Sequence, residues 1–167
     1  MTPSGLFPFL SQVFSPGTSG ILRISCLAAF GQNERESEKN KLPPLRILLV
    51  DDNAQFLEVA ARTLAAVPSI EIVGRALSGR DALEQVAQLQ PDLVLMDVAM
   101  PNMNGLEATR HIKAQPDAPR VVMLTLHDAP EYRAAAAAVG ADDFVSKAAF
   151  HTQVLPLIHA LRDEKET

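Results

Sequence analysis

The chain has 167 residues, of which 47% are hydrophobic and 21% charged, with one cysteine and a formal net charge of −5. A single cysteine excludes an intramolecular disulfide and is typical of a protein of the reducing cytoplasm. The net negative charge disfavours direct DNA binding, because gripping a phosphate backbone needs clustered lysine and arginine.

The first 44 residues differ from the rest of the chain. They carry four basic and three acidic side chains, a net charge of +1. Residues 45–167 carry eleven basic and seventeen acidic side chains, a net charge of −6. The apolar stretch 21–30 suggests a short helix, a membrane-surface contact or a disordered extension, and its lack of a periodic apolar face favours the last. The N-terminus lacks the basic region and uninterrupted apolar core of a signal peptide. No stretch reaches the roughly 18–20 apolar residues that a membrane-spanning helix needs. We therefore predict a non-domain extension over residues 1–44 and a cytoplasmic protein that does not bind a membrane.

From Leu45 onward, aliphatic runs alternate with segments of helical periodicity. The predicted strands are 46–50, 70–76, 93–96, 121–124 and 143–146. The predicted helices are 53–66, 78–90, 106–114, one from Asp128 through the alanines 134–138 to Gly140, and one ending near Arg162. Strands that are aliphatic on both faces and joined by helices predict a doubly wound five-stranded parallel sheet. The predicted domain covers 45–162, with a short tail over 163–167.

Two helix boundaries carry explicit predictions. Asp128 followed by Glu131 is the pattern of a capping box at a helix start, and Gly140 is typical of a helix end. Pro156 falls inside the last predicted helix, where proline removes a hydrogen bond at a cost of about 3 kcal/mol. That helix is therefore expected either to begin near Leu155 or to be kinked at Pro156.

Polar side chains stand at the ends of the predicted strands. Asp51 and Asp52 follow the first strand, Asp97 the third, Thr125 the fourth and Lys147 the fifth. The carboxyl ends of parallel strands share one edge of a sheet, where ligands bind in α/β proteins. Helix capping alone would account for the first pair but not for the others. Grouped carboxylates suit Mg²⁺, and a carboxylate beside a divalent cation, a hydroxyl and an ammonium group is suited to accept a phosphoryl group.

Four stretches carry a resemblance to a known family. They are LLVDDN at 48–53, LVLMDVAMPNMNG at 93–105, VVMLTLHD at 121–128 and GADDFVSK at 140–147. Together they resemble the receiver domain of two-component response regulators, over about residues 45–162. The resemblance implies a flavodoxin-like (βα)5 fold and a phosphoprotein that assists its own phosphorylation and dephosphorylation but is not an enzyme.

The resemblance also implies which residues meet the phosphoryl group and the metal. Asp97 is expected to be the phosphorylation site. Asp52, Asp97 and the backbone carbonyl of Ala99 are expected to bind Mg²⁺ directly, and Asp51 through water.

Three further residues receive roles from the resemblance. Thr125 is expected to be the switch hydroxyl, Lys147 the cation that senses the phosphate, and Phe144 the aromatic that swings inward when Thr125 moves. An ordinary core position is the alternative for Phe144, since a buried phenylalanine needs no special role. Two residues depart from the family pattern: Leu126 is bulky for its place beside the switch, and Ala148 replaces a proline that many receivers carry.

Because only five residues follow the last predicted helix, we expect a stand-alone receiver with no output domain. A histidine kinase or a histidine phosphotransfer protein would supply the phosphoryl group. A downstream protein would bind the face built by residues 128–162, and a phosphorylation-dependent homodimer stays open. The alternatives are a phosphohydrolase of the haloacid dehalogenase type, whose DxD motif is absent after the first strand, an interaction module that is never phosphorylated, and a fragment of a longer DNA-binding regulator.

Overall fold

The structure, a computed structural model, describes residues 43–165, so the predictions for the first 42 residues and the last two lie outside the described part. Five strands form one sheet in the order β2-β1-β3-β4-β5, and all neighbouring pairs are parallel. The strands are β1 (Leu45–Val50), β2 (Ile70–Ala76), β3 (Leu93–Asp97), β4 (Arg120–Thr125) and β5 (Asp143–Ser146). This confirms the predicted doubly wound sheet.

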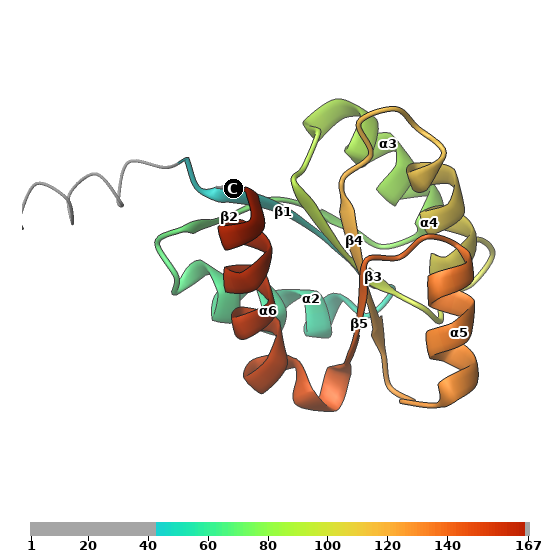
Figure 1. The fold of residues 1–167 in the computed structure, drawn as a ribbon. Coiled ribbons are helices and arrows are strands. Elements are labelled where there is room, and N and C mark those ends of the chain that lie inside the picture. Colours follow the sequence, from blue (N-terminus) through green and yellow to red (C-terminus); the bar gives the residue numbers. More distant parts are fainter. Residues whose placement is uncertain (1–42, 166–167) are drawn as a thin grey trace, which may run out of the picture. The chain divides into compact units, whose positions relative to one another are not determined.

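Helices cover both faces of the sheet (Figure 1). The helices are α2 (Ala54–Ala65), α3 (Gly79–Leu89), α4 (Gly105–Lys113), α5 (Pro130–Ala138) and α6 (Phe150–Lys165), and a single 3₁₀ turn, η1 (Lys147–Ala149), precedes α6. The helices α2 and α6 pack on one face, and α3, α4 and α5 pack on the other. The sheet is therefore buried between two helical layers.

The interior strand β1 shows why the sequence is aliphatic without alternation. Ile47 and Leu49 join the core under α2 and α6, whereas Leu48 and Val50 join the core under α3, α4 and α5. All four side chains are at most 1% exposed. A strand covered on both faces must be apolar at successive positions, and this one is.

The capping prediction for Asp128 is wrong. The helix α5 begins at Pro130, and within the described residues no side chain caps its first turn. Asp128 instead receives two hydrogen bonds from the guanidinium of Arg133, at 2.6 and 2.7 Å. A two-point bond between charged groups is stronger than a bond to one backbone N–H, and a proline at the first helical position has no N–H to offer. Gly140 closes the helix with φ 83°, as predicted.

The last helix, α6, is continuous through Pro156, so the predicted start near Leu155 is wrong. Phe150, Val154 and Ile158 are buried in one core at a spacing of four residues. This packing offsets the hydrogen bond that proline cannot donate, since tertiary burial routinely overrides local preference. The helix also extends past Arg162, its predicted end.

Candidate functional site

The register of the sheet places the predicted site residues at one edge. Val50 lies beside Met96, and Asp97 lies beside Leu124, so the chain leaves β1, β3 and β4 at the same level. Side-chain oxygens of Asp51, Asp52 and Asp97 lie within 4.8 Å of one another. They line a pocket of about 290 Å³. Its other lining residues are Asn53, Val98, Ala99, Thr125, Leu126, His127, Tyr132 and Lys147.

Lys147 forms the electrostatic centre of this pocket. Its Nζ lies 2.5 Å from Asp51 Oδ2 and 2.8 Å from Asp97 Oδ1, and its side chain is 9% exposed. Burial raises the pKa of Asp97, and the hydrogen bond and charge of Lys147 oppose this rise. Burial alone would lower the pKa of Lys147, but its ion pairs with the two carboxylates outweigh that cost and raise it. The ammonium group is therefore held charged between two buried carboxylates.

The donor set fits a divalent cation. Asp51 and Asp97 are buried and Asp52 is exposed, so the cluster opens to solvent on one side. Three carboxylates and one ammonium leave an excess of negative charge in the pocket. Asp51 Oδ2 touches the ammonium but, among the described residues, has no hydrogen bond of ordinary geometry. A hard cation with oxygen ligands, such as Mg²⁺, would compensate this charge.

The hydroxyl of Thr125 is engaged within its own loop. It donates to the backbone carbonyl of His127 at 3.1 Å and accepts from the backbone N–H of the same residue at 3.1 Å. Thr125 is buried at the end of β4. The predicted switch hydroxyl therefore lies in the pocket, held by a short turn.

Phe144 lies buried in the core under α3, α4 and α5. The guanidinium of Arg133 stands 4.9 Å from the centre of its ring, and Arg133 is in turn paired with Asp128. The ring thus has a core position and a cationic cover, and its inward movement on phosphorylation stays a prediction.

Two residues to which the sequence analysis assigned no role at the site lie close to it. The ring centre of Phe56 lies 4.8 Å from Lys147 Nζ, and the place of Phe56 in the predicted helix 53–66 did not indicate this contact. Gly105 opens α4 so close to Asp97 that an added Cβ would lie 1.9 Å from the Asp97 carbonyl oxygen. The position of Gly105 after the strand that ends in Asp97 was a sequence signal for its closeness to the site. The sequence contains no comparable signal for Phe56.

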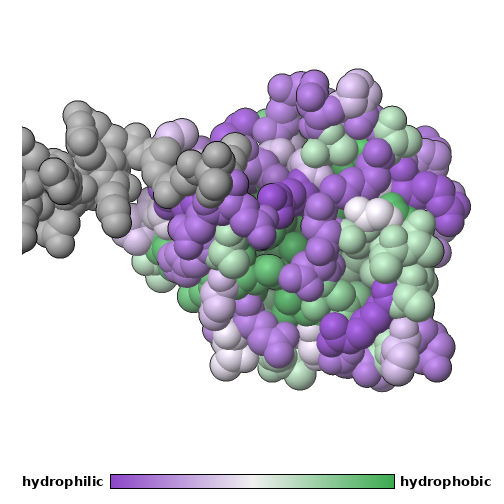
Figure 2. Space-filling view, in the orientation of Figure 1, coloured by the Kyte–Doolittle hydropathy of each residue, from purple (hydrophilic) through white to green (hydrophobic). Residues whose placement is uncertain are grey.

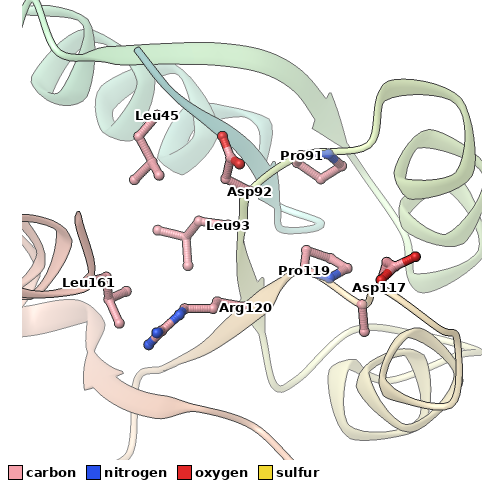
Figure 3. A pocket seen from close by; sticks show the side chains of 9 residues that line it. Leu45, Pro91, Asp92, Leu93, Asp117, Pro119, Arg120 and Leu161 are labelled. Atoms are coloured by element: carbon pink, nitrogen blue, oxygen red, sulfur yellow. The ribbon is translucent and has the colours of Figure 1, made fainter. Parts of the chain in front are cut away.

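A second pocket, of about 300 Å³, lies at the opposite edge of the sheet, where β1, β3 and β4 begin (Figure 3). It is lined by Leu45, Pro91, Asp92, Leu93, Asp117, Ala118, Pro119, Arg120 and Leu161. Arg120 is paired with Glu164 at 2.8 Å. Within residues 43–165, the group of carboxylates able to hold a metal lies at the other edge, so the chemistry is assigned there.

Comparison with known proteins agrees with this geometry. The family model described as the response regulator receiver domain matches residues 47–159. The chain belongs to this family. It thus contains a receiver, a signalling domain of two-component systems, and its acidic pocket is compatible with Mg²⁺ and with phosphorylation.

Two curated relatives illustrate the range of proteins that share this receiver. The chain is 43% identical over 111 residues to a protein-glutamate methylesterase/protein-glutamine glutaminase of a Nocardioides species, covering 65% of this chain and 30% of the relative. It is 38% identical over 116 residues to the transcriptional regulatory protein DegU of Brevibacillus brevis, covering 69% and 47%. The chain therefore matches less than half of the length of these relatives.

Two solved receivers match over nearly their whole length. The response regulator domain of Thermotoga maritima CheB is 30% identical, with a TM-score of 0.65, and the match covers 74% of this chain and 98% of that one. The receiver of NarL from Mycobacterium tuberculosis is 29% identical, with a TM-score of 0.68, covering 72% and 98%. Between residues 43 and 165, none of the receiver's helices has the length and apolar character needed to cross a membrane.

Proposed function

We propose that this receiver accepts a phosphoryl group on Asp97 from a histidine kinase or a histidine phosphotransfer protein. The observation that carries the proposal is the buried Asp97 carboxylate, 2.8 Å from Lys147 and grouped with two further carboxylates at the carboxyl ends of the strands. Such an arrangement favours attack by Asp97 on phosphorus, because positive charge faces the oxygens that become more negative.

In the proposed step, a carboxylate oxygen of Asp97 attacks the phosphorus of phosphohistidine. A new P–O bond forms, the P–N bond breaks, and the imidazole leaves with the electron pair and takes a proton. Asp52, Asp97 and the Ala99 carbonyl would hold Mg²⁺ directly and Asp51 through water, and the ion supplies positive charge to the phosphoryl oxygens when bound.

Two side chains would complete the proposed transfer. Lys147 would exchange its contact with Asp97 Oδ1 for one with a phosphoryl oxygen. Thr125 would leave the carbonyl of His127 and donate its hydroxyl to another phosphoryl oxygen, and Phe144 would respond to that movement. Both contacts add positive or donor character where the phosphorylated aspartate gains negative charge.

Intact-mass measurement tests the proposal. With Mg²⁺ and acetyl phosphate, the wild type should gain one phosphoryl group and Asp97→Asn none. Equal labelling of the two proteins would overturn the assignment. Sustained turnover of p-nitrophenyl phosphate would instead favour the phosphohydrolase alternative.

The signal is proposed to leave through residues 128–162, which form α5, β5 and α6. Thr125 supports this route because its hydroxyl holds the loop that leads directly into α5. Pale green residues lie beside purple ones in the region of α5 in Figure 2, as expected for a helix of alanines and charged residues, and Ala136 is the residue of this helix that is buried. We propose that a cytoplasmic protein or a second copy of the chain binds here after phosphorylation. The net −6 over residues 45–167 argues against direct DNA binding by this domain.

A further inference from the structure

The ammonium group of Lys147 has an aromatic neighbour as well as its two carboxylates. The ring centre of Phe56 lies 4.8 Å from Lys147 Nζ, within the roughly 6 Å at which a cation and an aromatic face attract each other. Asp51 and Asp97 contact the same nitrogen from the sheet edge. The lysine side chain is 9% exposed, so the ring and the carboxylates together leave the ammonium little water. Because desolvation strengthens a cation–aromatic contact, this one belongs to the stronger class.

The position of the Phe56 ring is fixed from two elements. Phe56 lies in the first turn of α2, where its backbone N–H donates to the side chain of Asn53 at 3.2 Å. Its ring meets that of Phe150 edge-on, with 5.5 Å between centres and 76° between planes. Phe150 is buried at the start of α6, and its own ring stands edge-on to His151 at 5.9 Å. The ring that faces Lys147 is therefore held by the helix on one side and by a core aromatic on the other.

We propose that Phe56 is a positioning residue for Lys147, which its ring keeps beside the acceptor carboxylate. The inference rests on the proposed function, in which Lys147 meets the phosphoryl oxygens. A lysine side chain is flexible, and the ion pair between Lys147 Nζ and Asp97 Oδ1 must change when Asp97 becomes an acyl phosphate. The attraction of an aromatic face is less directional than a hydrogen bond. The ammonium can therefore keep its contact with the ring while it moves from the carboxylate to the phosphoryl group.

Simple apolar packing is the competing explanation for Phe56, since the ring also borders the core under α2 and α6. Two variants separate the explanations. Phe56→Leu keeps an apolar side chain and removes the aromatic face, whereas Phe56→Tyr keeps the face. Val59→Ala serves as control, because Val59 lies on the same helix and is 51% exposed.

The first measurement does not depend on phosphorylation. In ¹H–¹³C spectra of the metal-free protein, the ring current of Phe56 should shift the Hε protons of Lys147 upfield. The shift should persist in Phe56→Tyr and Val59→Ala and disappear in Phe56→Leu. Lys147 Hε protons at the ordinary lysine position in the wild type would overturn the proposal, whether or not Asp97 accepts phosphate.

The second measurement follows labelling of Asp97 at increasing acetyl phosphate concentration. Phe56→Leu should lower the maximal rate constant by about fivefold or more, which corresponds to about 1 kcal/mol. The donor concentration at half-maximal rate should stay within about twofold, and Phe56→Tyr should behave like the wild type. Equal losses in Phe56→Leu and Phe56→Tyr, or none in Phe56→Leu, would overturn the positioning role. Absence of labelling in the wild type would overturn the proposed function instead, and the spectra would then decide the ring contact alone.

Discussion

The hydroxyl of Thr125 and the backbone of His127 hold each other through two hydrogen bonds of 3.1 Å, one donated in each direction. This short turn ties the end of β4 to the loop before α5. For Thr125 to donate its hydroxyl to a phosphoryl group on Asp97, the bond to the His127 carbonyl must break, and the loop then loses one of its two tethers to β4. The geometry therefore couples the proposed chemistry to the position of α5 through a single side chain.

Removal of that hydroxyl should separate phosphorylation from its consequence. We expect Thr125→Val to be labelled on Asp97 but to show no beryllofluoride-dependent change in amide exchange over residues 128–162, whereas Thr125→Ser should respond like the wild type. Hydrogen exchange with mass spectrometry measures both. A full response in Thr125→Val would contradict the route, as would wild-type changes confined to the loop after Asp97.

Magnesium should stabilise the folded protein through the acidic pocket. At ten times the dissociation constant, a ligand that binds only the folded state adds about 1.4 kcal/mol, which raises the melting temperature of a domain of this size by several degrees. Asp97→Asn should lose most of this rise, because it removes one of three grouped carboxylates. Asp117→Asn, at the opposite edge of the sheet, should keep it. An unchanged rise in Asp97→Asn would place the metal elsewhere.

The stability of the metal-free protein should depend on pH through Asp97. Burial raises the pKa of Asp97 above its ordinary 3.8, so the folded state binds this proton more readily than the unfolded state does. The contribution of Asp97 to stability must therefore fall as pH rises from 3.8 through the raised value. Asparagine does not titrate, so Asp97→Asn should gain stability relative to the wild type over this window. Urea denaturation in EDTA at successive pH values tests this, and a constant difference would refute it.

The close approach of α4 to the acceptor should make Gly105 intolerant of substitution. An alanine Cβ there would lie 1.9 Å from the Asp97 carbonyl oxygen, so the backbone has to shift. We expect Gly105→Ala to lower stability by about 3 kcal/mol and to slow labelling of Asp97. Gly140→Ala, whose added carbon meets nothing closer than 3.6 Å but whose φ is 83°, should cost only about 1 kcal/mol and leave labelling unchanged. Similar effects in both variants would contradict the close contact between Gly105 and the Asp97 carbonyl as the cause of the loss.

Deletion of residues 1–44 should leave the melting temperature and the labelling of Asp97 almost unchanged. The described cores draw on Leu45 and later residues, and β1 is secured at its start by the bond from the Leu45 N–H to the Ser69 carbonyl at 2.8 Å. Calorimetry of the full chain and the truncated protein makes the comparison. A fall of more than about 5 °C, over about 1 kcal/mol for such a domain, would mean that the segment packs on it.

The sheet and the meeting of the carboxylates could be predicted because both follow from local pattern and one topological rule. Strands aliphatic on both faces must be parallel and covered, and their carboxyl ends then share an edge, which brings Asp51, Asp97 and Lys147 together. The contact of Phe56 with Lys147 could not be predicted from these patterns. It depends on how α2 and α6 dock beside each other, which a 3.6-residue period does not specify.

The two wrong helix boundaries have a common physical origin. Asp128 has a capping pattern, yet Arg133 offers it a two-point ionic partner from the next turn. Pro156 has a breaking pattern, yet the burial of neighbouring side chains along α6 keeps the helix intact. In both places an interaction between side chains outweighs a preference of the backbone, and a local pattern does not contain that information.

The alanines of α5 bear on how such a domain can diverge. Ala136 is buried, whereas Ala134, Ala137 and Ala138 are exposed and small. Exposed helix positions accept most side chains at little cost, because no core has to be rebuilt around them. After gene duplication, substitutions on this helix alone could therefore give the two copies different binding partners while the aspartates and Lys147 stay unaltered. The exposed face of α5, which can change in sequence, is therefore separate from the acidic pocket, where the proposed chemistry restricts substitution.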